Sequence, residues 1–205
     1  KHKNSDIREL ANAYTLNIYD SDDIYDFFDF TTEAFTPWQQ LEYFQLITNR
    51  PLAPKADFGK WINPKYENSI ISLSLDLVAY YHQETAIEPI HSMIKIDHTK
   101  MRRKMIRTLG ILNQKQSIVV LMNLYIEEDD MKCKTEIVKS LGYMGYKNEK
   151  VIHFLEELLK TEFHTNFRKA ILIALSRATA SDSILENKIY RYELEKTVPN
   201  EQKIL

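Results

Sequence analysis

The sequence predicts an all-α protein built from stacked helical hairpins. One helical segment recurs along the second two-thirds of the 205-residue chain, and a second amphipathic segment follows each copy. Only 4 Gly and 6 Pro occur, which are too few for the frequent turns of an all-β protein. Hydrophobic residues make up 44% of the chain and charged residues 27%, so a continuous core can be buried.

The recurring segment has ten positions, and its strong copies begin at Met101, Cys133 and Phe167, with a weaker copy from Ile70. In the strong copies positions 1, 5 and 6 are apolar, position 2 is a cation, position 8 is small and position 9 is Leu. Positions 1, 5, 8 and 9 share one stripe of an α-helix. We therefore expect the Leu residues to face the core, and the small position 8 to permit close helix approach. Position 8 is Thr108, Ser140 and Ala174.

Each copy is followed by a second amphipathic segment, so each unit is predicted to be a helical hairpin. The second segments lie at 87–94, 118–125 and 152–159, with a poorer one around 184–189. Residues 67–195 therefore predict four antiparallel helix pairs, and a short tail completes the region 67–205. Position 10 is glycine at Gly110 and Gly142, where we expect it to loosen or cap the helix before a turn.

This pattern resembles HEAT repeats, particularly the short variety named after phycobilisome lyase subunits, whose second helix reads apolar-Arg-x-x-Ala-x-x-Ala-Leu-Gly. The resemblance covers roughly residues 67–195, although Met, Ile and Ser largely replace Ala. It implies a right-handed α-α superhelix, a solenoid in which the repeated helix lines the concave surface. In the family an Asp that ends one helix pairs with the Arg that opens the next. The matching pairs here are Asp97 with Arg102, Asp129 with Lys134, and Phe163, which replaces Asp, with Arg168.

Residues 1–66 differ in composition from the repeats. They hold 13 of the 23 aromatic residues and four of the six Pro. We expect helices at 22–30 and 38–47 and a short, irregular helix at 57–62, which together form divergent repeats or an aromatic-rich cap. The aromatic cluster of residues 25–38 either forms the core of these units or exposes some rings as a docking patch.

The sequence offers no catalytic or metal-binding set, so we expect a protein that is not an enzyme and has no cofactor. Some HEAT-like hydroxylases bind iron through recurring His-Glu pairs, but none of the six His residues here is followed by Glu. His91, between two Ile residues, is expected to be a partly buried helical residue. Cys133 aligns with Met101 and Phe167 and is expected to be a core thiol. The acidic runs 20–23 and 127–130 are expected to be solvated helix ends, and acidic residues are favourable ahead of a helix N-terminus.

Charge is distributed unevenly along the chain. The net charge of −2 divides into −7 for residues 1–98 and +5 for residues 99–205. The segment 100–107 holds five cations and no anion. Once the apolar stripe is assigned to the core, a candidate concave binding site remains, formed by Arg103, Lys104, Arg107 and Lys139. These cations form either an ordinary solvated face or a site for an acidic partner. Among acidic partners we favour an acidic protein segment over anionic lipid headgroups or phosphate.

The function we expect is a non-catalytic scaffold that binds another protein through the solenoid surface. The alternative is a nucleic-acid-binding array similar to HEAT-like DNA glycosylases, which the acidic half with Trp38 and Trp61 disfavours. The composition is typical of a bacterial source. No apolar run reaches the roughly 20 residues that span a bilayer. Because the chain opens on Lys1 without Met, we expect a cytoplasmic segment that an upstream anchor could tether to a membrane.

Overall fold

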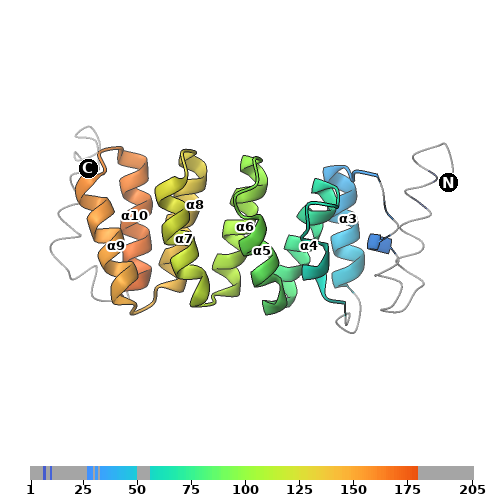
Figure 1. Ribbon diagram of the computed structural model, residues 1–205, viewed down its shortest axis with the longest axis horizontal. Helices are drawn as coiled ribbons and strands as arrows, with labels where there is room; N and C mark the ends of the chain where they lie inside the picture. The colour runs from blue at the N-terminus through green and yellow to red at the C-terminus, as the bar shows by residue number, and fades with distance from the viewer. Residues whose placement is uncertain are drawn as a thin grey trace, which may run out of the picture. The chain divides into compact units, whose positions relative to one another are not determined.

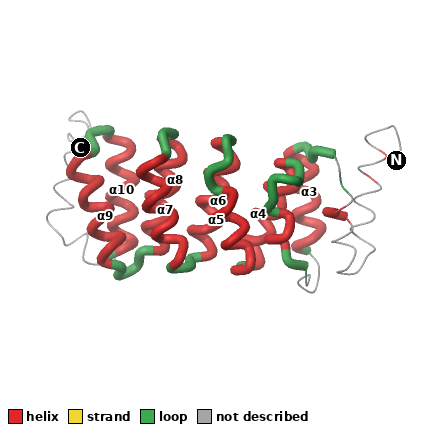
Figure 2. Tube along the Cα trace, in the orientation of Figure 1, coloured by secondary structure: helices red, strands yellow, loops and turns green. Residues whose placement is uncertain are grey.

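The computed structural model describes residues 7, 10, 27–29, 31, 33–49 and 56–179, and within these residues it contains helices and no strand (Figures 1 and 2). The chain divides into two units, residues 1–108 and 109–205. The helix expected around 184–189 and the acidic run 20–23 lie outside the described residues. The α-helices are α3 (Pro37–Thr48), α4 (Asn68–Tyr81), α5 (Ile87–Met93), α6 (Thr99–Leu112), α7 (Gln116–Glu127), α8 (Met131–Met144), α9 (Glu149–Thr161) and α10 (Thr165–Ala178). Two 3₁₀ helices, η1 (Phe58–Trp61) and η2 (Glu84–Ala86), accompany them.

The recurring segment coincides with α6, α8 and α10. Its position 9 is Leu109, Leu141 and Leu175, and each of these side chains is 0% exposed. The residues at positions 1, 5 and 6 of the three strong copies are buried as well. The predicted helical phase is therefore confirmed.

Side-chain caps explain where several of these helices begin. Thr36 and Gln39 form a capping box ahead of α3, and Pro37 occupies the first turn, where a missing N–H has no cost. Asp130 caps α8, because its carboxylate accepts hydrogen bonds from the backbone N–H groups of Lys132 and Cys133. Asn148 caps α9 in the same way.

Gly110 and Gly142 were expected to loosen or cap their helices, and the structure shows that the expected cap is wrong. Both glycines lie inside their helices. A Cβ on Gly110 would lie 2.6 Å from Ser140 Oγ, and one on Gly142 would lie 2.6 Å from Ala174 Cα. Position 10 of one repeated helix thus meets position 8 of the next, and the absent Cβ permits the close approach.

The cation at position 2 contacts the end of the preceding helix. Arg102 Nη1 donates to the carbonyl of Ile96 at 2.8 Å, and Arg168 Nη1 donates to the carbonyls of Leu159 and Glu162 at 2.7 and 2.6 Å. These carbonyls follow or end a helix, where backbone acceptors lack a partner within the helix. Lys134 instead places its ammonium 5.2 Å from the Tyr125 ring centroid. Because Arg168 binds backbone oxygens, this contact persists although Phe163 replaces the acidic residue.

Most described rings of the N-terminal aromatic cluster form the core of unit 1. Phe28 stacks on Trp61 with ring centroids 4.4 Å apart, and both side chains are 0% exposed. Phe27 and Phe35 are also buried, whereas Trp38 is 71% exposed. The helix predicted at 38–47 is α3, and the irregular helix at 57–62 is η1. The described rings thus favour the core interpretation, with Trp38 as the exception, and Tyr25 and Phe30 lie outside the described residues.

Candidate functional site

The exposed side of the repeated helices can be assigned within unit 2, where α8 packs against α10 (Figure 1). Positions 3, 7 and 11 recur every four residues and so form one stripe along a helix. On α8 this stripe is Thr135, Lys139 and Tyr143, and on α10 it is Lys169, Ile173 and Arg177. Lys139 and Lys169 are exposed, and Tyr143 and Ile173 remain 58% and 51% exposed although they are large and apolar.

A cation–π contact joins the two stripes. The Arg177 guanidinium lies 4.1 Å from the Tyr143 ring centroid. Both residues occupy position 11, so equivalent positions of α8 and α10 lie next to each other. We call the set Lys139, Tyr143, Lys169, Ile173 and Arg177 the α8/α10 face.

No acidic side chain is exposed on α8 or α10. The α10 sequence contains no Asp or Glu, and the one acidic residue of α8, Glu136, is 5% exposed. Positive charge on the α8/α10 face is therefore not offset by an exposed anion on the same two helices. Such a surface attracts an acidic partner and disfavours a basic one.

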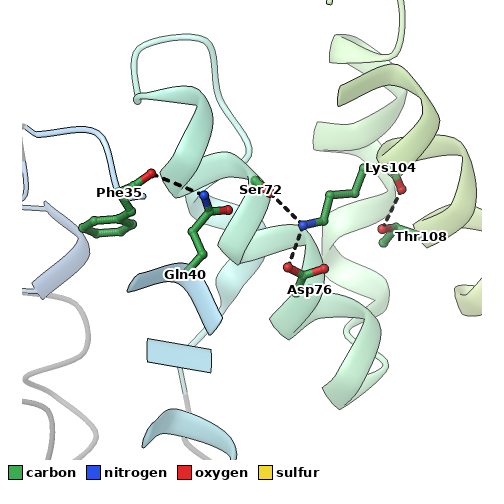
Figure 3. Close-up of polar contacts among 6 residues, drawn as sticks. All are labelled: Phe35, Gln40, Ser72, Asp76, Lys104 and Thr108. Carbon is green, nitrogen blue, oxygen red and sulfur yellow. Dashed lines mark hydrogen bonds and ion pairs between the residues drawn. The ribbon is translucent and has the colours of Figure 1, made fainter. Parts of the chain in front are cut away.

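The cations predicted on α6 have a different environment, which belongs to unit 1. Lys104 Nζ lies 2.6 Å from Asp76 Oδ2 and 2.7 Å from Ser72 Oγ, both on α4 (Figure 3). Its side chain is 26% exposed. The expectation that Lys104 faces outward as a binding cation therefore needs correction, because an intramolecular carboxylate already holds it.

The other predicted cations divide between exposed and half-buried positions. Arg103 is half-buried and Arg107 is exposed, both on α6, whereas Lys139 is exposed on α8. The structure thus places Lys139 with other exposed residues of unit 2. Sequence reasoning missed Tyr143, Lys169, Ile173 and Arg177, although the repeat alignment that assigned the core also places them on the outer stripe.

The acidic run 127–130 is not wholly solvated. Glu128 is 7% exposed and accepts a hydrogen bond from the backbone N–H of Asp130. Asp130 itself caps α8, and the hydrogen bonds from the backbone of Cys133 and Lys132 lower its pKa below the ordinary value. The run therefore contributes to the junction between α7 and α8.

The residues considered for metal binding or nucleophilic chemistry occupy ordinary packing positions. Cys133 is buried, as expected for its core alignment, and His91 is half-buried on α5, where burial lowers its pKa despite the nearby Glu88. Within the described ranges, no three His, Cys, Asp or Glu residues gather closely enough to hold a metal ion. Nor is any helix in that part of the chain long and apolar enough to cross a bilayer.

A polar cleft of about 590 Å³ lies in unit 1, lined by Asp29, Thr31, Lys60, Lys65, Tyr66 and Glu67. Asp29 accepts hydrogen bonds from Lys60, Trp61 and Tyr66. Burial raises the pKa of Asp29, but these three bonds outweigh burial and lower the pKa overall. The carboxylate of Asp29 is thus engaged by the protein itself, and its bonds tie η1 to residues 27–29.

Comparison with known proteins adds no family assignment. No protein-family model matches the sequence, and no curated protein matches it either. The function therefore has to be inferred from the residues and contacts described above.

Proposed function

We propose that the chain is a non-catalytic scaffold that binds an acidic region of another protein through the exposed side of its repeated helices. The observation that carries this proposal is the α8/α10 face, where cations and large apolar side chains occur together without an exposed acid on either helix. Protein interfaces are rich in Tyr and Arg near their centres. Tyr143 and Arg177 are therefore the residues we expect to contribute most to the binding energy.

We further propose that the hairpins belong to the HEAT type and build a right-handed α-α superhelix. The support is that the same contact recurs, since Gly110 meets Ser140 and Gly142 meets Ala174. A contact repeated at the same positions indicates the same helix-to-helix displacement, which is how solenoids extend. Small-angle X-ray scattering of the chain would test this, because an extended array has a larger radius of gyration than a globular domain of equal length.

The exposed apolar residues favour a protein partner over a nucleic acid. Nucleic-acid surfaces are bound mainly through phosphate contacts, which need cations but not exposed aliphatic groups such as Ile173. Cys133 is buried and is the single Cys of the sequence, so it forms no internal disulfide, which suits the reducing cytoplasm that we propose as the location. A bacterial source remains part of this proposal.

The experiment that tests the function is affinity capture from a lysate of the source cells, followed by calorimetry with the purified partner. Wild type is compared with the double variant Lys139→Glu/Arg177→Glu. The control is Lys115→Glu/Lys150→Glu, which changes the net charge equally but alters exposed residues where α7 and α9 begin. Acidic residues are tolerated there because they complement the helix dipole.

We expect wild type and the control to retain one acidic partner and the Lys139→Glu/Arg177→Glu variant to lose it. Circular dichroism must show that all three proteins are folded. A partner retained equally by both double variants would contradict the proposed function. A duplex DNA titration with a steep fall of affinity at rising salt would instead favour the nucleic-acid alternative.

A further inference from the structure

Unit 1 shows how one repeat contact accommodates a cation. Counting from Ile70, Asp76 is position 7 of the α4 copy and Ser72 is position 3. Lys104, at position 4 of α6, reaches both of them, with Nζ 2.6 Å from Asp76 Oδ2 and 2.7 Å from Ser72 Oγ (Figure 3). Position 4 of one repeated helix thus meets positions 3 and 7 of the preceding one, and a carboxylate there neutralises the cation.

The same positions hold different side chains in unit 2. Position 7 of α8 is Lys139, position 3 is Thr135, and position 4 of α10 is Ala170. The cation is now on the preceding helix, and a methyl group stands where the partner side chain would be. Lys139 is exposed, and within residues 109–179 no ion pair joins it to an acidic side chain.

The surroundings of Lys139 determine what it can bind. Lys169 lies at position 3 of α10 and Arg177 at position 11, so cations stand on both sides of Ala170 along the helix. Tyr143 and Ile173 are exposed between the cations. The α8/α10 face therefore alternates positive and apolar side chains along and across the two helices.

We infer that the surface beside Lys139 and Ala170 receives a carboxylate from an extended acidic segment of a partner protein, in the role that Asp76 has for Lys104. This inference rests on the proposed function and adds the position, the ligand group and the form of the partner. The carboxylate binds Lys139, and apolar side chains of the segment contact Tyr143 and Ile173.

The spacing of the face supports an extended segment. Residues four apart on a helix are separated by roughly 6 Å along its axis. Alternate residues of an extended chain are separated by about 6.6 Å and point to the same side. A segment in which acidic and apolar residues alternate at every second position can therefore follow the α8 stripe, with one carboxylate or apolar group for each step of the helix.

The test uses the full chain and two fluorescein-labelled peptides of identical composition. Each has about eight residues, enough to follow the 14-residue α8 in extended form. In one peptide Glu and Leu alternate at every second position with Ser between them, so that both kinds of side chain point to the same side. In the other peptide the Glu residues all precede the Leu residues, with the same Ser spacing. Fluorescence anisotropy measures their dissociation constants, and anionic vesicles and duplex DNA serve as competing probes.

Variants at Ala170 separate charge from shape. Ala170→Glu supplies an internal carboxylate for Lys139, whereas Ala170→Gln has nearly the same volume without the charge. Larger side chains are accommodated at position 4 of the other copies, where Lys104 and Glu136 stand. We expect Ala170→Glu to weaken binding of the alternating peptide roughly tenfold, because its carboxylate would occupy Lys139 in place of the peptide's carboxylate. Ala170→Gln carries no charge and should change the affinity less than about twofold.

Lys139→Glu keeps the test decisive if both Ala170 variants fail to fold, because Lys139 is exposed and its replacement does not alter the core. It should weaken binding of the alternating peptide at least as much as Ala170→Glu.

The inference is overturned if folded Lys139→Glu binds this peptide like wild type, if both peptides bind equally, or if vesicles or DNA bind more tightly than either. If wild type does not bind the peptides but still captures a partner through the α8/α10 face, the inference is overturned and the proposed function stands. If wild type binds the alternating peptide but captures no partner through the α8/α10 face, the proposed function is overturned.

Discussion

The contact between α4 and α6 in unit 1 joins position 4 of one repeated helix to positions 3 and 7 of the preceding one. In unit 2, where α8 packs against α10, the residues that the repeat aligns with these positions differ in charge. In unit 1 the cation Lys104 meets the carboxylate of Asp76. In unit 2 the cation Lys139 and the methyl group of Ala170 occupy the corresponding positions. An ion pair completes the first contact within the chain, whereas the second leaves a cation on the surface.

This difference shows why a run of cations in a repeat protein does not by itself identify a binding site. The segment 100–107 is the most cationic part of the sequence, yet Lys104 within it is held by α4. Fewer cations lie near Lys139 in the sequence, but α10, the helix that packs against α8, contains no Asp or Glu that could pair with it. The partner of each position in the adjacent repeat therefore decides whether a cation is structural or available.

The largest expected effect is on stability, and it tests the helical phase that places Lys139 on the solvent-exposed side of α8. Leu141→Ala should lower the free energy of unfolding by about 2–5 kcal/mol, because Leu141 is fully buried and truncation leaves a cavity. Lys139→Ala, two residues earlier and exposed, should change it by less than about 0.5 kcal/mol. Chemical denaturation measures both values, and similar losses at the two sites would mean that the two faces of α8 are misassigned.

The next effect concerns the close approach of α8 and α10. Gly142→Ala should destabilise the protein by about 1–3 kcal/mol, because its Cβ would lie 2.6 Å from the Cα of Ala174, a backbone atom that cannot rotate away. An exposed helical glycine replaced by Ala would instead gain about 1 kcal/mol. Thermal and urea unfolding distinguish the two signs, and a stabilised Gly142→Ala variant would show that these helices are farther apart than described.

A smaller effect is expected at the cap of α8. Asp130→Ala should cost about 1 kcal/mol because two backbone N–H groups lose their acceptor, whereas Asp130→Asn should cost much less because Asn is an equally good cap. The pKa of Asp130 is lowered from its ordinary value of 3.8, so the cap stabilises the fold fully above pH 3.8 and loses this contribution as the pH falls through the lowered pKa. Unfolding curves of wild type and Asp130→Ala should therefore converge at low pH. A constant difference across this range would contradict the charged cap.

The smallest stability effect belongs to the ion pair of unit 1. Asp76→Ala should destabilise the protein by about 0.5 kcal/mol, since the pair is partly exposed, with side-chain exposures of 26% for Lys104 and 43% for Asp76. The loss should shrink as salt is added, because salt screens the pair. Lys139→Ala should show no such salt dependence. Equal salt dependence of the two variants would remove the distinction between Lys104, which is paired with Asp76, and Lys139.

The repeated helices and their core face could be predicted from the sequence because burial of apolar side chains follows helical periodicity. Leu109, Leu141 and Leu175 are buried for this local reason. The role of Gly110 and Gly142 was not predictable from local propensity, since glycine near a helix end is typical of a cap. Glycine is required at these positions because the next repeated helix lies so close. The sequence pattern of one helix gives no information about that distance.

The candidate site was only partly predictable for a similar reason. The alignment placed Lys104 and Lys139 off the apolar stripe, but it did not show that position 4 of one helix meets positions 3 and 7 of the preceding helix. This relation is evident only from the structure, in which Lys104 contacts Ser72 and Asp76. With it, the same alignment predicts that Ala170 lies beside Lys139 and brings Tyr143, Ile173 and Arg177 into the candidate surface.

The most direct test of the account compares the two cations in one binding measurement. Lys104→Gln and Lys139→Gln remove one positive charge each, and calorimetry at low salt would measure the affinity of each folded variant for the captured acidic partner. Because Lys104 is already paired with Asp76, we expect Lys104→Gln to bind like wild type. Lys139→Gln should bind roughly threefold to tenfold more weakly, with a reduced dependence on salt. Equal weakening by both variants, or weakening by Lys104→Gln alone, would contradict the claim that Lys139, rather than Lys104, is the cation that binds.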